Sequence, residues 1–191
     1  MNIPTRKLSF IAIMTSLCIS TNYLLIGIPN VKIMDLLVFV SGYTMGSLIG
    51  AAVGVLTWLV YGTINPYGFN LPTLIATSTG ESIYGIVGGI SMKLGLRVGS
   101  NSPRIGGEFL TSGLKLGILG FLLTFTYDLL TNVVTALVFG GSLILWIIQG
   151  IPFTVTHEVS NFLFFFISGG PLIRIVRGLT SIESEEVKSH Q

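Results

Sequence analysis

Long apolar runs limit what this chain can fold into. Six such runs alternate with polar stretches rich in Gly, Pro and Asn, at 7–27, 33–46, 48–62, 72–93, 115–139 and 143–170. A bilayer has a hydrocarbon core of about 30 Å, which about 20 helical residues cross. Half of the residues are apolar and only 9% are charged, a composition unlike that of a compact water-soluble domain. We therefore expect an all-α integral membrane protein with six transmembrane helices.

The region 33–62 allows two readings, one long tilted helix or a hairpin near Gly46–Ser47, and the positive charges favour the hairpin. With six spans and a cytoplasmic N-terminus, only Lys32 lies outside. The remaining basic residues of the spans and their connections then lie inside, namely Arg6, Lys7, Lys93, Arg97, Arg104, Lys115, Arg174 and Arg177. We expect both termini in the cytoplasm, with a transmembrane domain at 1–178 and a frayed polar tail at 179–191.

Glycine recurs every four residues across the expected hairpin, at Gly42, Gly46, Gly50 and Gly54. In a soluble helix each interior glycine costs roughly 0.5–1 kcal/mol relative to alanine. In lipid, small residues let helix backbones approach closely, so these glycines predict tight packing within the bundle. The single cysteine, Cys18, excludes an internal disulfide and predicts apolar packing.

Several functional classes are disfavoured by the sequence. A net charge of +2 without a basic, aromatic-rich run argues against a nucleic-acid partner. The chain lacks the G-x-x-x-x-G-K-[ST] motif, so it does not bind ATP as P-loop proteins do. The fragment "HEVSN" differs from the zinc motif H-E-x-x-H because Asn161 replaces the second histidine. We therefore expect no metal, no cofactor and no catalytic residues, and a packed, hydrogen-bonded His157.

Polar residues inside the expected spans are candidates for function, because charge is costly in hydrocarbon. Glu81 lies nine residues into the fourth run and shares a helix face with Tyr84. This face serves either interhelical hydrogen bonds or ligand binding, and for Glu81 we favour ligand binding. Asp128 and Asn132 share a face of the fifth run, which indicates either a buried network or a water-filled cavity. In the last run Trp146 and Gln149 lie on the flank that also carries His157.

The order and spacing of these features resemble those of the S components of energy-coupling factor (ECF) transporters, the membrane vitamin receptors of bacteria and archaea. The similar segments are "IPNVKIMDLLVFVSGYTMGSLIGAAVGVLTWLVYG" and "GIPFTVTHEVSNFLFFFISGGPLIRIVRG", within a short six-helix plan. The resemblance covers nearly the whole chain. It implies a binding protein, not an enzyme, that passes a water-soluble vitamin or related heterocycle inward.

The resemblance also implies where substrate and partners bind. A pocket open to the outside would be roofed by the loops after the first and third helices and lined by the last three helices. The implied substrate-binding residues are Asn30, Asn65, Tyr67, Asn70, Glu81, Tyr84, Asp128, Asn132, Trp146 and Gln149, with Lys32 as a further loop candidate. A small-residue face at Ala12, Ser16 and Ser20 would dock on the ECF transmembrane coupling subunit, and two ATPase subunits would supply energy.

Two acids in the spans and no base suggest a ligand that is neutral and polar or cationic, such as a thiamine-like, pyridoxine-like or nucleobase-like molecule. Two alternatives stay open. The chain is similar in outline to structural scaffolds of the rod-shape-determining type, which need no closed pocket. An intramembrane enzyme that uses Glu81, Asp128 or His157 is less favoured, because no nucleophile–base spacing or metal-ligand set is evident.

Overall fold

The computed structural model describes residues 5–64, 66, 68–96, 98 and 107–189, and their side chains except at 108 and 181–189. These residues form helices and no strands, which confirms the all-helical prediction for the described part of the chain. In order the helices are α1 (Thr5–Leu24), α2 (Met34–Met45), α3 (Ser47–Ile64), α4 (Leu71–Lys93), α5 (Gly107–Phe139) and α6 (Leu143–Ser189). Each corresponds to one predicted apolar run.

The hairpin between α2 and α3 turns at a single residue. Gly46 has a φ of +96°, a conformation that suits glycine, and its N–H donates to the carbonyl of Gly42. The new helix begins at once with Ser47. The prediction of a hairpin in place of one long helix is therefore confirmed, and Gly46 serves the turn, not the packing expected of it.

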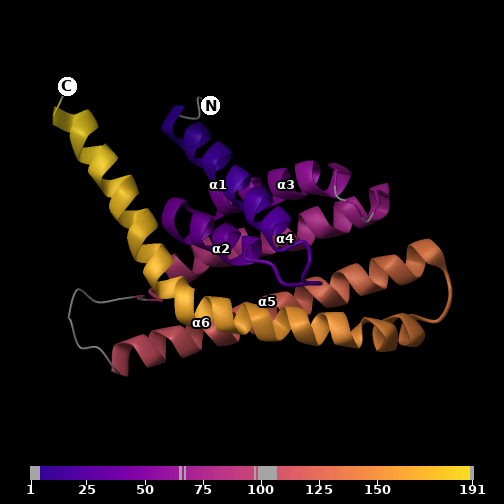
Figure 1. Cartoon of the computed structure of the whole chain (residues 1–191). Coiled ribbons are helices and arrows are strands. Elements are labelled where there is room, and N and C mark those ends of the chain that lie inside the picture. The colour runs from indigo at the N-terminus through magenta and orange to yellow at the C-terminus, as the bar shows by residue number, and fades with distance from the viewer. Residues whose placement is uncertain (1–4, 65, 67, 97, 99–106, 190–191) are drawn as a thin grey trace.

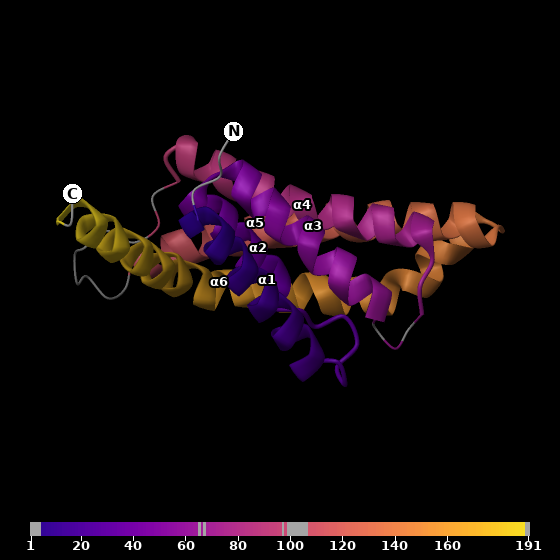
Figure 2. The same ribbon diagram turned by 90° about the horizontal axis from the view of Figure 1, so that it is seen from above.

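The helices form two groups that pack together, as Figure 1 shows. Helices α5 and α6 run alongside each other as one long pair, and α1 to α4 lie on that pair. Helix α4 is central because it contacts α2, α3 and α5, whereas α1 packs against α2 and α3. Helix α6 contains Pro152 and Pro171, and its C-terminal half turns away from α5 (Figures 1 and 2). The segment expected to fray after 178 is helical through Ser189.

Three glycines let α2, α3 and α4 meet backbone to backbone. A Cβ on Gly42 would overlap the carbonyl group of Gly85, and one on Gly50 would lie 2.5 Å from the Cα of Gly42. A Cβ on Gly54 would lie 2.9 Å from the carbonyl carbon of Glu81. The predicted close packing is confirmed at Gly42, Gly50 and Gly54. It draws the turn of α4 that carries Glu81 against α3.

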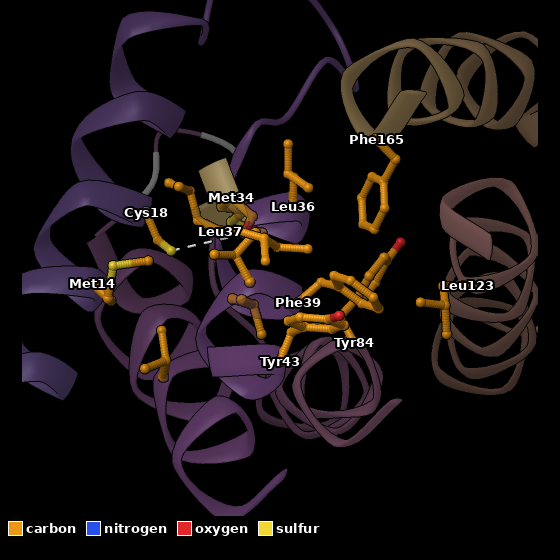
Figure 3. Close-up of a cluster of buried hydrophobic side chains, with 14 of the residues drawn as sticks. Met14, Cys18, Met34, Leu36, Leu37, Phe39, Tyr43, Tyr84, Leu123 and Phe165 are labelled. Atoms are coloured by element: carbon orange, nitrogen blue, oxygen red, sulfur yellow. Dashed lines mark hydrogen bonds between the residues drawn. The ribbon is translucent and has the colours of Figure 1, made fainter. Parts of the chain in front are cut away.

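The apolar core surrounds α2 (Figure 3). Cys18 of α1 is buried there, and its thiol lies 3.8 Å from the carbonyl of Met34, so the predicted apolar packing is confirmed. On the other side of α2, the rings of Phe39 and Phe165 lie 5.2 Å apart, and Tyr84 packs between them and α5. Side chains from α1, α2, α4, α5 and α6 thus share one core.

Length and composition suit three of the described helices to crossing a membrane, namely Ser47–Ile64, Phe109–Phe139 and Leu143–Thr180. Helix α2 is apolar but has 12 residues, a rise of about 18 Å, which is less than the hydrocarbon thickness. The described helices are therefore compatible with a membrane location. Six spans and the cytoplasmic position of both termini stay predictions.

Candidate functional site

A cavity of about 710 Å³ lies where the connections after α1 and α3 meet the helix ends. Its walls come from residues 22–32, the last turns of α3, the first turns of α4, the end of α5 and the start of α6. The lining is mostly apolar, and it includes aromatic rings and amides, namely Trp58, Tyr61, Phe69, Phe139, Phe153, Asn22, Asn30 and Asn70. The volume and this mixture are typical of small-molecule sites.

Of the predicted site residues, Asn30 and Asn70 line this cavity, and so does Lys32. Asn30 adopts a left-handed φ of 56° and donates from Nδ2 to the carbonyl of Phe153 at 3.2 Å, which ties the connection after α1 to α6. Asn70 caps α4 by accepting from the Thr73 N–H at 2.8 Å. Asn65 and Tyr67 lie outside the described residues.

One boundary of the cavity is built from aromatic rings and a lysine. The Trp58 and Tyr61 rings lie edge to face at 5.5 Å. The Lys32 ammonium lies 5.3 Å from the centre of the Trp58 ring and 5.2 Å from that of Tyr127, so it makes cation–π contacts with both. Residues from three separate segments therefore meet at this boundary.

Glu81 lies beyond Trp58 and is not among the cavity-lining residues. Its side chain is fully buried, and Oε2 accepts from the Trp58 indole N–H at 3.2 Å. It also interacts electrostatically with Asp35 and Lys32. Trp58 thus presents one part of its ring to the cavity and its N–H to Glu81.

A buried charged cluster, which we call the aspartate–histidine network, cross-links α2, α5 and α6. His157 on α6 lies 2.7 Å from an Asp35 oxygen through Nε2 and 2.9 Å from an Asp128 oxygen through Nδ1. The Nδ2 of Asn161 lies one helical turn further along α6 and donates to the same Asp35 oxygen at 2.6 Å. An ionised carboxylate only accepts hydrogen bonds, so two ionised aspartates at these distances require both ring nitrogens to donate, which makes the ring an imidazolium between two anions.

The same cluster extends to α4 through hydroxyl groups. Asn161 Nδ2 also donates to Thr124 Oγ1 at 2.7 Å, and the Tyr84 hydroxyl donates to that oxygen at 2.9 Å. The Thr124 hydroxyl itself donates a hydrogen bond to the carbonyl of Gly120 at 2.8 Å. Tyr84 and Asp128, both predicted site residues, therefore bind other protein groups and do not line the cavity.

The remaining predicted site residues lie near the α5–α6 turn and do not line the cavity either. The amide of Asn132 packs against Gly150, and the Trp146 indole N–H donates to the carbonyl of Gly140 at 2.8 Å. Gln149 is exposed. On α1 the residues of the predicted docking face are exposed, and the opposite face is buried against the bundle.

Sequence reasoning missed the two residues that organise the interior. Asp35 was not among the candidate residues, yet it is buried at the first turn of α2. His157 was expected to be packed, but its role between two carboxylates was not foreseen. The spacing of His157 and Asn161 in "HEVSN" was the available signal, since both reach Asp35 from one helix face.

A scan against protein-family models, a search of curated proteins and a search of solved structures each found no match to this chain. The class of protein is therefore described from its fold and its cavity alone. The described residues form an all-helical protein, compatible with a membrane location, with one side of its helix bundle hollowed by an aromatic and amide-lined cavity.

Proposed function

We propose that this chain is a membrane-embedded binding protein for uptake of a small water-soluble heterocycle of the vitamin type. The carrying observation is the cavity, because its volume suits a small molecule and it lies beside the connections after α1 and α3. The ECF resemblance implies a pocket in that part of the chain.

The lining matches the chemistry of a ring-shaped ligand. Trp58, Tyr61 and Phe69 offer faces and edges for stacking, and Asn22, Asn30 and Asn70 offer amide groups that fix the ring edge. The Asn30–Phe153 hydrogen bond and the Asn70 cap hold two of these amides in place before a ligand arrives. Such preorganisation lowers the entropy cost of binding.

Transport rests on the ECF resemblance. In this proposal the chain crosses the membrane six times with both termini inside, and an ECF transmembrane subunit with two ATPase subunits supplies the energy. The exposed face of α1 supports docking, because Ala12, Ser16 and Ser20 are small and leave room for a partner helix. The Ser16 hydroxyl donates to the Ala12 carbonyl at 2.8 Å, so the face presents few free polar groups to lipid.

The ionisable side chains of the interior support a role in ligand binding without catalysis, because they bind other protein groups. Asp35, Asp128 and His157 bind one another, and Glu81 binds Trp58. None of these side chains is among those that line the cavity. We therefore propose a receptor and not an intramembrane enzyme.

The test is native mass spectrometry of the chain purified in mild detergent from cells supplied with a broad vitamin mixture, followed by denaturing release. We expect one heterocyclic molecule per chain. Protein that is consistently empty, and that stays empty when the same vitamins are added after purification, would contradict the proposal. It would favour the structural scaffold of the rod-shape-determining type.

A further inference from the structure

The charge that lines the described part of the cavity is positive. Among the described lining residues Lys32 is the one charged side chain, and no carboxylate is present in that part of the lining. The three nearby buried acids lie outside the lining and have partners of their own. Asp35 and Asp128 bind His157, and Glu81 binds Trp58. A cationic ligand in this cavity would find no carboxylate to pair with.

Lys32 keeps its hydrogen-bond donors available. Its ammonium contacts the faces of Trp58 and Tyr127, and neither ring face supplies a conventional acceptor for its three N–H groups. Asp35 and Glu81 attract it electrostatically, but among the described side chains no carboxylate oxygen lies within 4.0 Å of it. A half-buried ammonium that has no acceptor among the described residues gains most from a ligand group that brings anionic oxygens.

The first turn of α4 adds a second positive feature to the same cavity. Asn70 and Thr73 line it, and the N-terminal end of a 23-residue helix carries partial positive charge. Thr73 lines the cavity, and its hydroxyl oxygen is buried and has no hydrogen-bond partner among the described residues. Lys32 and the first turn of α4 thus line the cavity from different segments of the chain.

We propose that the cavity binds a flat aromatic ring bearing one anionic group, a carboxylate or a phosphate, and that Lys32 is the residue that selects this group. The inference rests on the proposed function and names its substrate class. It replaces the neutral or cationic ligand that the sequence suggested, because that expectation counted the acids and bases of the spans and left out the loop candidate Lys32. The ring lies against Trp58 and its neighbouring aromatic side chains, and the anionic group faces the ammonium.

The test uses isothermal titration of the purified chain with matched probes. Nicotinate is compared with nicotinamide, 4-aminobenzoate with 4-aminobenzamide, and pyridoxine 5′-phosphate with pyridoxine, while thiamine serves as the cation. We expect at least one acidic probe to bind about 30-fold or more tightly than its uncharged counterpart. The first two pairs report a carboxylate and the third a phosphate. Lys32→Met should abolish the preference and leave the uncharged counterpart unaffected, and Lys32→Arg should retain it.

The matched control is Lys93→Met, at the exposed far end of α4, which should keep the wild-type preference. Tighter binding of thiamine or of an uncharged probe would overturn the inference, as would a preference that survives Lys32→Met. If no probe binds, the molecule released from the purified chain decides. A net negative charge at neutral pH supports the inference, and a neutral or positive molecule overturns it while leaving the proposed function intact. A chain that binds nothing and purifies empty overturns the proposed function itself.

Discussion

The two polar regions on either side of Trp58 differ in how their polar groups are used. In the aspartate–histidine network each charged group faces a partner of opposite charge, with His157 fully buried between Asp35 and Asp128. The cavity instead encloses open volume, and the Lys32 ammonium at its edge has two aromatic neighbours and no hydrogen-bond acceptor among the described residues. The first region is complete within the chain, whereas the second has room and donors for a ligand.

This difference shows why buried charge alone is a poor guide to a binding site. A paired and hydrogen-bonded charge inside a membrane protein can serve the fold, because it joins helices that otherwise meet only through apolar contacts. Open volume and donors without acceptors are the better signal of a missing molecule. Trp58 belongs to both regions, since it lines the cavity and donates to Glu81.

The largest effect is expected where the network loses its central cation. His157→Ala leaves Asp35 and Asp128 buried without their partner, which should lower the free energy of unfolding by about 3–5 kcal/mol. Unfolding by SDS in mixed micelles measures it. Thr156→Ala on the exposed neighbouring position should have little effect, since that hydroxyl binds only its own helix. A His157→Ala protein that is stable but has lost its ligand would place the network in the binding site. The network and the cavity would then not be separate in function.

A smaller effect is expected at the residue shared by both regions. Trp58→Phe removes the donor to the buried Glu81 carboxylate and should cost about 1–3 kcal/mol of unfolding free energy. It should also weaken binding in the same titration, because a stacking surface of the cavity shrinks. Trp146→Phe is the control, since its indole N–H binds an exposed turn. Unchanged stability of Trp58→Phe would mean that Glu81 does not need this donor.

The outer edge of the network should respond less. Tyr84→Phe removes one hydroxyl donor to Thr124, while Asn161 still donates to the same oxygen. We expect a loss of about 1 kcal/mol in the same unfolding assay and no change in ligand affinity. Loss of affinity without loss of stability would show that the cavity extends to Tyr84 when a ligand is bound.

The smallest effect on stability is expected at the cavity. Lys32→Met removes a half-buried ammonium that has no close ion-pair partner among the described residues, so the free energy of unfolding should change by less than about 1 kcal/mol. Binding should respond strongly, which is the reverse of the behaviour expected for Tyr84→Phe. A drop in stability like that of His157→Ala would assign Lys32 to the network.

The sequence predicted the elements well because local signals determine them. Apolar runs set the helices, and the hairpin that the positive charges favoured turns at Gly46. The connections that hold Asn30 and Asn70 were also identified as parts of a site, and both residues line the cavity. The use of Asp35 could not be predicted, because its partners are 122 and 126 residues away and depend on how α2 and α6 rotate against each other. Lys32 was identified as a topology signal and as a loop candidate, but its contacts could not be predicted, since nothing local places it against Trp58 and Tyr127.

The most direct measurement compares ligand retention in two variants of α5. Thr135 lines the cavity and Thr126 is exposed, and each hydroxyl binds only a carbonyl of its own helix. Thr135→Trp fills cavity volume, whereas Thr126→Trp adds the same side chain on the outer face. By native mass spectrometry we expect wild type and Thr126→Trp to carry one small molecule per chain and Thr135→Trp to be empty, with all three equally stable. A molecule retained equally by Thr135→Trp would show that this cavity is not the binding site.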